Sequence, residues 1–236
     1  MAYFNEFTFY MKERQRLSTD ILANQKLIST AHRSSVVGFL EKICKHLAIP
    51  AEVLFKTVDY LDRFLLQAPT NLITPQHLQS IGATALVIAM KACELDSKGL
   101  FGRVASFCDG GLTATDLKTL EWHILKTLSF DLNRPTALDF LYQYILPVHV
   151  TDENSTTRVG RMMKMAETIL IRSLHSYDLS CCKPSLLAKI VLSKASQQMH
   201  FPVDANNLNH VHGAHKVQIV YYRRKLQSFL AELSAA

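Results

Sequence analysis

Val58-Asp-Tyr-Leu-Asp-Arg-Phe-Leu65 places three charged residues inside a segment that is otherwise apolar or aromatic. The surrounding periodicity predicts a helix from Ala51 to Leu66, bounded by prolines on both sides. Asp59 and Asp62 are three residues apart on one helix face, where paired carboxylates could act as an acid and a base. Arg63 follows Asp62 directly, so a structural ion pair is the simpler interpretation.

A second basic residue, Arg33, is the first residue of the helix expected to open this half of the chain. We predict an internal ion pair between Arg33 and Asp62 that locks the two helices together. Such a pair is structural, because removing one partner would leave an uncompensated charge in the interior.

The rest of the first half has the 3.6-residue period of helices separated by short breakers. The expected helices run from Arg33 to Leu47, from Thr74-Pro75 to about Cys93, from Gly99 to Cys108, and from Thr113 to about Ser129. The centre of the second of these, Ala83 to Met90, is apolar all round, and such a helix should lie in the middle of a bundle. Thr113-Ala-Thr-Asp116 resembles a capping box.

After Pro135 a similar series begins again. The expected segments are a helix from Pro135 to Leu146, a polar linker from Thr151 to Thr157, and helices from Arg158 to His175, Lys183-Pro184 to about His200, and Ala214 to Leu233. Phe4 to Arg16 forms a further short amphipathic helix. We therefore predict an all-α fold of two tandem five-helix bundles, over 31–133 and 134–236, preceded by an N-terminal helix and linker over 1–30.

Composition supports this class. Of 236 residues, 48% are hydrophobic, which is enough for a core, and only 8 are Gly and 7 are Pro. No apolar run approaches the length of a membrane span, and no secretory signal is visible, so we expect a soluble intracellular chain. The net charge of +6 is spread along the chain, which argues against nucleic-acid binding. Five cysteines without a CxxC pattern predict reduced thiols.

Sequence signatures of enzymes are absent: there is no GxGxxG, phosphate loop, GxSxG or HExxH. His210, His212 and His215 have a spacing that does not bring three imidazoles to one helix face, so we predict no metal site and no cofactor. The basic and aromatic residues near the C-terminus, Lys216 and Tyr221 to Lys225, could contact phosphates. A solvated helix face explains them more simply.

Two charges stand out because they fall on apolar helices of the predicted bundle. Lys91 ends the all-apolar helix, and Glu121 lies in the middle of Leu120-Glu-Trp-His-Ile-Leu125. A solvated lysine and glutamate are the simplest interpretation. The alternative is that both border a docking groove, where they could form charge-assisted hydrogen bonds with backbone groups of a partner.

These residues, in this order, resemble the cyclin family. Val58 to Leu65 resembles the cyclin-box segment that commonly reads Asp-Arg-Phe-Leu, and His32 to Leu40 lies where cyclins have a Met-Arg-Ala-Ile-Leu segment, with Arg33 as its arginine. Gly82 to Lys91 resembles the third cyclin-box helix, and Leu120 to Leu132 resembles the fifth. The resemblance covers about residues 33–146, and the second half matches mainly in its helix pattern.

The resemblance implies a regulatory subunit that binds and activates a cyclin-dependent protein kinase in cell-cycle control, does no chemistry itself, and acts in the nucleus, the cytoplasm or both. It implies kinase contacts at five positions, which are Lys91, Glu121, Leu125, Phe130 and Leu132. Arg33 and Asp62 would keep the box intact. Protein substrates of the kinase are possible further partners.

The chain departs from the cyclin pattern in two places. Ala92-Cys93-Glu94 follows Lys91 where many cell-cycle cyclins have an aromatic residue and two glutamates. The patch that binds Arg-x-Leu peptides is also altered, with Lys42 in place of a glutamate; its positions here are His32, Val36, Phe39, Leu78 and Gln79. We expect this patch to bind such peptides poorly. Arg14-Gln-Arg-Leu17 has the form of a degradation signal, which short patterns often have by chance.

An alternative keeps the fold and changes the function. Proteins like transcription factor IIB use the same helical box to bind DNA and the transcription machinery, and the positive net charge would suit that role. Lys91 and Glu121 favour the kinase-binding interpretation.

Overall fold

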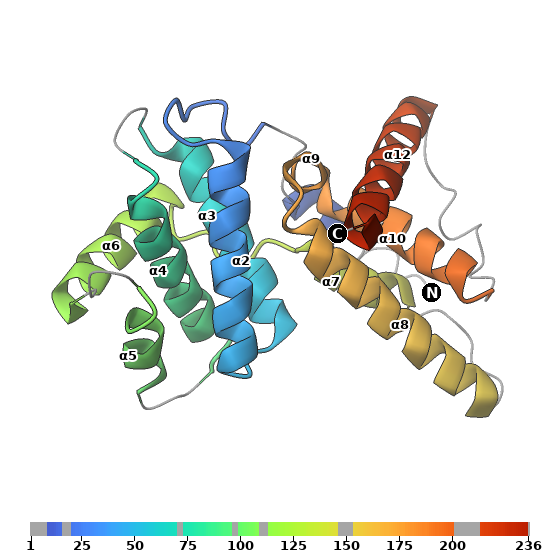
Figure 1. Cartoon of the computed structure of the whole chain (residues 1–236), viewed down its shortest axis with the longest axis horizontal. Coiled ribbons are helices and arrows are strands. Elements are labelled where there is room, and N and C mark those ends of the chain that lie inside the picture. The colour runs from blue at the N-terminus through green and yellow to red at the C-terminus, as the bar shows by residue number, and fades with distance from the viewer. Residues whose placement is uncertain are drawn as a thin grey trace. The chain divides into compact units, whose positions relative to one another are not determined.

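The computed structural model describes residues 9–15, 20–69, 73–95, 99–108, 113–145, 153–200 and 213–235. All regular secondary structure in these ranges is helical, as the sequence predicts (Figure 1). The chain divides into two compact units. The first unit is Thr19–Asn133, and the second combines Met1–Ser18 with Arg134–Ala236. The N-terminal segment, including the helical residues 9–14, therefore groups with the second half of the chain.

The first unit is a helical bundle built around one central helix. Its helices are α2 (Thr30–His46), α3 (Ala51–Gln67), α4 (His77–Ala92), α5 (Leu100–Ala105) and α6 (Ala114–Thr127). Helix α4 contacts all four of the others, and every residue from Ile81 to Met90 is buried. The prediction of a central apolar helix is confirmed. Gly82 permits the close approach of α2 and α4, because a Cβ atom there would lie 3.0 Å from Val36 Cγ2.

The ends of these helices follow local capping chemistry. The predicted capping box is present: Thr113 Oγ1 accepts a hydrogen bond from the Asp116 amide, and the Asp116 carboxylate accepts one from the Thr113 amide. Helix α2 begins earlier than expected because Ser29 and His32 form an equivalent pair. Pro75 is not the first residue of α4; it lies in a turn in which the His77 amide donates to the Thr74 carbonyl.

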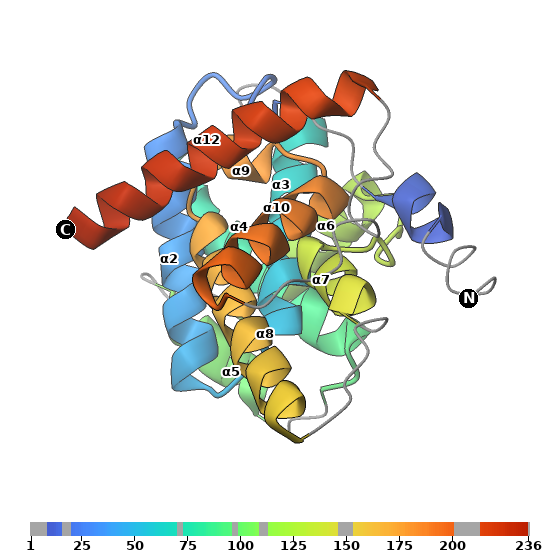
Figure 2. The ribbon, with the colours of Figure 1, turned by 90° about the vertical axis from the view of Figure 1, so that its right-hand side faces the viewer.

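The second unit also has a central helix. Its helices are α7 (Ala137–Ile145), α8 (Glu153–Ser173), α9 (Tyr177–Ser180), α10 (Pro184–Gln198) and α12 (Gly213–Ala235). Helix α10 opens with Pro184 at its first turn and contacts α7, α8 and α12, and α12 runs above it in the view of Figure 2. The prediction of a polar linker over 151–157 is wrong from Glu153 onward, because α8 begins there. Helix α9 is a single turn, too short for periodicity to reveal.

Lys189 on α10 is half-buried, and its charge interacts with that of Lys12 in the N-terminal segment, which is exposed. Lys189 of α10 lies over the ring of Tyr144 on α7, at 5.4 Å from its centroid. Burial, with a smaller contribution from Lys12, lowers the pKa of Lys189 to about 8. Partial desolvation also lowers the pKa of Lys12. Both shifts mean that the folded state favours the neutral amine.

The stability of the second unit should therefore rise as the pH increases through 8. In the unfolded chain Lys189 keeps an ordinary pKa near 10.5, so the unfolded state binds more protons between these values. We expect a higher melting temperature at pH 9.5 than at pH 7.5, measured by circular dichroism. Lys189→Met should flatten this rise, whereas Lys164→Met, at an exposed position of α8, should preserve it. An unchanged slope in Lys189→Met would contradict the prediction.

Candidate functional site

Arg33 and Asp62 form a fully buried, two-pronged ion pair between α2 and α3. Arg33 Nε donates to Asp62 Oδ1 at 2.7 Å, and Nη2 donates to Oδ2 at 2.9 Å. The side chains are 0% and 2% exposed. Two charges removed from water in this way are tolerated only with good geometry and further hydrogen bonds. The pair therefore fixes one relative placement of the two helices.

Helix α3 also holds the turn that follows α6. Arg63, itself buried, donates from Nη1 to Asp59 Oδ2 at 3.2 Å and from Nη2 to the Asp131 carbonyl at 2.7 Å. The hydroxyl of Tyr60 donates to the Leu132 carbonyl at 3.0 Å. Burial raises the pKa of Tyr60, so this hydroxyl keeps its proton. We call the contacts of Tyr60 and Arg63 with Asp131 and Leu132 the α3 clamp.

The clamped turn has an unusual backbone. Ser129 and Phe130 have φ values of +53° and +56°, in the left-handed region that non-glycine residues rarely adopt. The turn is closed by hydrogen bonds from the Phe130 amide to the Leu125 carbonyl, at 2.9 Å, and from the Asp131 amide to the Leu128 carbonyl, at 3.1 Å. Such backbone conformations persist where the surrounding structure enforces them, and they cluster at functional sites.

The turn leaves Phe130 on the surface, 56% exposed. Its ring meets that of Trp122 edge to face, with centroids 5.9 Å apart, and Trp122 is 57% exposed. Trp122 is not among the site residues predicted from the sequence. The helical period could have identified it, because Trp122 does not lie on the buried face of α6 that contains Ile124 and Leu128.

Lys91 and Glu121 converge on this part of the first unit. Lys91 Nζ lies 2.7 Å from Glu121 Oε1 and 2.8 Å from Oε2, which joins the last turn of α4 to the middle of α6. The side chains are 45% and 20% exposed. An exposed pair of this kind contributes only about 0–1 kcal/mol to stability. Each charged group can therefore leave the other and bind polar groups of a partner protein at a low cost in free energy.

The apolar residues predicted for the same site differ in exposure. Leu125 lies one turn after Glu121 on α6 and is half-buried, as is Leu132 beyond the turn. Leu125 therefore lies next to the ion pair on α6, whereas exposed Phe130 and Leu132 belong to the turn that follows this helix. The site thus combines one exposed ion pair with leucine and aromatic side chains, a composition suited to binding a protein.

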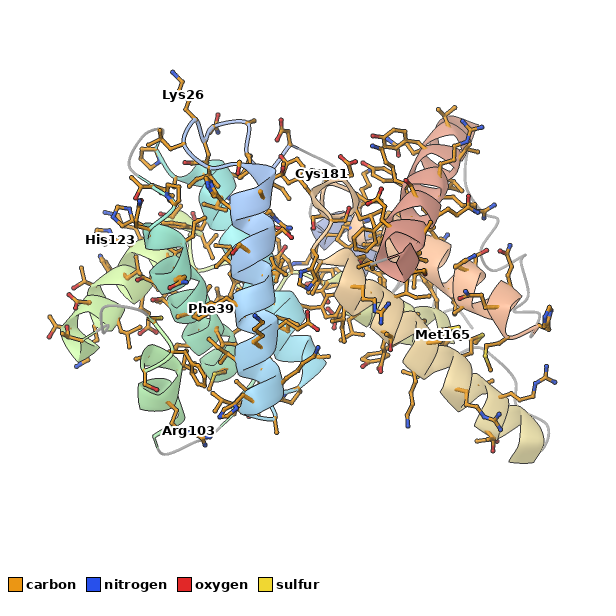
Figure 3. The ribbon with its side chains drawn as sticks, in the orientation of Figure 1. Lys26, Phe39, Arg103, His123, Met165 and Cys181 are labelled. Atoms are coloured by element: carbon orange, nitrogen blue, oxygen red, sulfur yellow. The ribbon has the colours of Figure 1, made fainter. Side chains whose placement is uncertain are left out.

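Four of the five residues predicted to bind Arg-x-Leu peptides are buried or half-buried. Val36 and Leu78 are each only 3% exposed, so they belong to the core of the first unit. Phe39, labelled on α2 in Figure 3, and Gln79 are half-buried. His32 is exposed, and its Nδ1 accepts a hydrogen bond from the Ser29 amide at the start of α2.

Metal-ligand chemistry finds no support in the described ranges. No group of three or more His, Cys, Asp or Glu side chains there could hold a metal ion. His210 and His212 lie outside the described residues, and the side chain of His215 does too. The five cysteines are free thiols, and burial raises the pKa of Cys44 to about 12.

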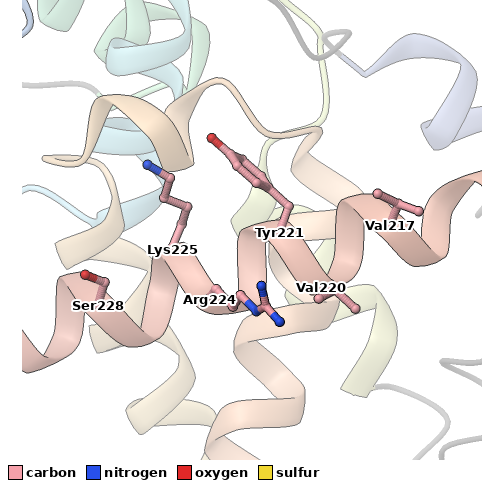
Figure 4. Close-up of a pocket in the computed structure, with 6 residues that line it drawn as sticks. All are labelled: Val217, Val220, Tyr221, Arg224, Lys225 and Ser228. Carbon is pink, nitrogen blue, oxygen red and sulfur yellow. The ribbon is translucent and has the colours of Figure 1, made fainter.

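Of the basic and aromatic residues near the C-terminus, Tyr221, Arg223 and Arg224 are exposed on α12, Lys225 is half-buried and Tyr222 is buried. A hollow of about 740 Å³ runs along this helix, and Figure 4 shows its lining residues, which are Val217, Val220, Tyr221, Arg224, Lys225 and Ser228. Lys225 Nζ lies 2.6 Å from Asp178 Oδ2 of α9 and 5.7 Å from the centroid of the Tyr221 ring. At least one cation of this segment is therefore engaged within its own unit. Among the described helices, none is long and apolar enough to cross a membrane.

Comparison with known proteins identifies the family. Residues 5–133 match the family described as the cyclin N-terminal domain. The chain is 31% identical over 190 residues to Cyclin-O protein B of Xenopus laevis and 30% identical over 179 residues to Cyclin-A1-4 of Oryza sativa subsp. japonica. These matches cover 79% and 74% of this chain. The chain belongs to the cyclin family, as the sequence motifs suggested.

The relatives are longer than the region they share with this chain. The matches span 51% of Cyclin-O protein B and 48% of Cyclin-A1-4. Among solved structures, the viral cyclin from Herpesvirus saimiri aligns over 97% of this chain and 96% of its own length, with a TM-score of 0.77 at 17% identity. The CAK complex of Chaetomium thermophilum bound to ATP-gamma-S aligns over 98% of this chain and 70% of that chain, with a TM-score of 0.61 at 16% identity. These structures share the all-α cyclin fold.

Breaking the buried ion pair should destabilise the first unit strongly. Asp62→Asn leaves Arg33 charged and without its ionic partner in the interior, and we expect a loss of about 3–5 kcal/mol in the free energy of unfolding. Chemical denaturation followed by circular dichroism measures this loss.

The double variant Arg33→Met with Asp62→Leu should lose less than Asp62→Asn, because it removes both charges. Glu41→Gln, at an exposed ion pair with Lys45, is the control and should change little. A loss below 1 kcal/mol for Asp62→Asn would show that the pair does not hold the unit together.

Proposed function

We propose that this chain is the regulatory subunit of a cyclin-dependent protein kinase in cell-cycle control, with no catalysis of its own. The observation that carries the proposal is the Lys91–Glu121 ion pair, which joins α4 and α6 at the surface one helical turn before Leu125. Its setting in a cyclin-family domain supports a kinase as the partner. We also propose that the protein acts in the nucleus, the cytoplasm or both.

The chemistry of the pair fits recognition of a polypeptide backbone. An ammonium group can donate to carbonyl oxygens at the end of a partner helix, and a carboxylate can accept from backbone amides. Hydrogen bonds with one charged member contribute about 1.5–3 kcal/mol when water is excluded. Leu125, Leu132 and Phe130 would supply the apolar contacts that exclude it.

Activation follows if the partner's active arrangement presents these groups and its inactive arrangement does not. The chain then binds the active state more tightly and shifts the population of the kinase toward it. The name of one structural neighbour is consistent with such a role. It is a chain of the yeast RNA Pol II CTD kinase CTDK-1 complex, and the alignment covers 77% of this chain and 60% of that chain with a TM-score of 0.58.

The alternative, a transcription-factor-IIB-like protein that binds DNA, makes a different demand on the surface. It requires a continuous basic face that contacts phosphates, and its binding to duplex DNA would weaken steeply with salt. A docking ion pair flanked by leucines and aromatic rings would have no part in such binding.

Removing the ion pair should abolish kinase activation while the fold is retained. The chain is co-purified with a panel of cyclin-dependent kinases, and substrate phosphorylation is measured for each. For a kinase that the wild type activates, Lys91→Ala with Glu121→Ala should reduce activation at least 10-fold, because two charge-assisted contacts are lost. Glu41→Ala with Lys45→Ala removes another surface ion pair of the same unit and should have no effect. Full activation by the Lys91/Glu121 variant would locate the interface elsewhere.

The same complex should recruit Arg-x-Leu substrates poorly. Val36 and Leu78 are buried, and exposed Lys42 places a positive charge where a basic peptide would approach. We expect fluorescence anisotropy of a labelled Arg-x-Leu peptide to show no saturation at tens of micromolar. Micromolar affinity would contradict this expectation.

A further inference from the structure

The outer face of α6 carries a stripe of three exposed residues, Lys118, Trp122 and Lys126, spaced four residues apart. Residues with this spacing are neighbours on a helix surface, and the two ammonium-bearing residues are separated by about 12 Å along the axis. Exposed His123, labelled in Figure 3, follows Trp122 on the same helix. We call Lys118, Trp122 and Lys126, together with Phe130, the α6 stripe.

The aromatic part of the stripe is held in place. Trp122 and Phe130 contact each other edge to face, and each exposes more than half of its side chain. Phe130 points outward because Ser129 and Phe130 adopt positive φ angles, and the α3 clamp fixes the turn through Tyr60. Single exposed apolar residues are common, but two adjoining rings on an enforced backbone indicate a binding surface.

The charged part of the stripe is free to act on a partner. Lys118 and Lys126 form no ion pair within the described part of the chain. The carboxylates nearest to them in the sequence are already engaged. Asp116 accepts hydrogen bonds from Thr113, Glu121 pairs with Lys91, and the Asp131 carboxylate lies 3.8 Å from Arg63 Nη2. The stripe therefore presents positive charge on both sides of an aromatic surface.

We propose that the α6 stripe binds an acidic helical segment of the partner kinase, in which an apolar side chain is flanked by carboxylates four residues away on each side. A helix is the matching occupant because it repeats the four-residue spacing of α6, so that two carboxylates face Lys118 and Lys126 while the apolar side chain packs on Trp122. The partner's identity rests on the proposed function; the chemistry of the segment rests on the stripe itself.

The stripe shares Phe130 with the apolar contacts proposed around the Lys91–Glu121 pair, but its lysines and Trp122 lie on another face of α6. Trp122 directly follows Glu121, so its side chain points about 100° away around the helix axis. The ion pair is suited to backbone groups, whereas the stripe is suited to side chains. The stripe would therefore determine which kinase is bound rather than whether one can be bound.

The first experiment uses the only tryptophan of the chain as its reporter, since Trp122 is the single Trp in 236 residues. The probe is a tryptophan-free helical peptide with the pattern Glu-x-x-x-Leu-x-x-x-Glu. We expect a saturable shift of the Trp122 emission to shorter wavelength, which weakens at 0.5 M salt. A matched peptide with Lys in place of both Glu should give no shift. No shift with the acidic peptide, or equal shifts with both peptides, would overturn the proposal.

Charge reversal tests the lysines separately from the ring. Lys118→Glu with Lys126→Glu should weaken binding of the acidic peptide at least 10-fold, while Trp122 remains as the reporter. Lys26→Glu with Lys164→Glu makes the same change at two exposed positions away from α6 and should leave the affinity unchanged. Equal losses in the two variants would show a general effect of net charge and would count against the stripe.

A second experiment separates this proposal from the proposed function. The chain is prepared with 5-fluorotryptophan, which gives one fluorine resonance from position 122, and a kinase that co-purifies with it is added. We expect the resonance to shift and Lys118→Glu with Lys126→Glu to weaken kinase binding at least 5-fold. A kinase that depends on Lys91 and Glu121 but neither shifts the resonance nor responds to the lysine variant would overturn the stripe and leave the proposed function standing. A kinase whose binding depends on Lys118 and Lys126 but not on Lys91 and Glu121 would support the stripe and overturn the role of the ion pair.

Discussion

The buried ion pair between Arg33 and Asp62 is the contact on which the first unit depends most. Charges in an interior are costly unless each finds a partner with good geometry, so a sequence that buries them accepts very few arrangements. Asp62 fixes the place of α2 through its bond with Arg33. Arg63 fixes the place of the turn after α6 through its bond with the Asp131 carbonyl. The apolar helix α4 could pack in several ways against an apolar neighbour. The polar groups of α3 select one of them.

The same helix connects the core to the surface. Tyr60 and Arg63 hold the carbonyls of Leu132 and Asp131, and between these contacts and α6 the backbone passes through two left-handed residues. The hydrogen bonds are not complete, because Arg63 Nε has no hydrogen-bond partner among the described residues. The clamp therefore bears one unsatisfied donor as well as a strained turn. In return the turn holds Phe130 against Trp122 in the solvent, where neither ring contributes much to folding. Such an arrangement is better explained by binding than by stability.

The sequence was sufficient to predict the features that follow from periodicity and from charge in unexpected places. The central position of α4 followed from its apolar body, the start of α6 from Thr113 and Asp116, and the pairing of Arg33 with Asp62 from the cost of burying either alone. The remaining features depend on contacts between distant segments. The two positive φ angles at Ser129 and Phe130 have no glycine to signal them, because side chains of α3 enforce them. The early start of α8 was missed because polar residues at a helix terminus resemble a linker.

The Arg33–Asp62 and Lys91–Glu121 ion pairs of the first unit differ in burial, and this difference determines the role that each can have. Arg33 and Asp62 have no water available to replace a lost partner, so their contact behaves as a fixed part of the structure. Lys91 and Glu121 lie at similar distances from each other, yet water or another protein can replace either partner, and their contact contributes little to stability. A residue that binds a second protein must be able to leave its first partner cheaply. The exposed pair meets this condition and the buried pair does not, which is why the binding surface is expected on α4 and α6 while α2 and α3 hold it in position.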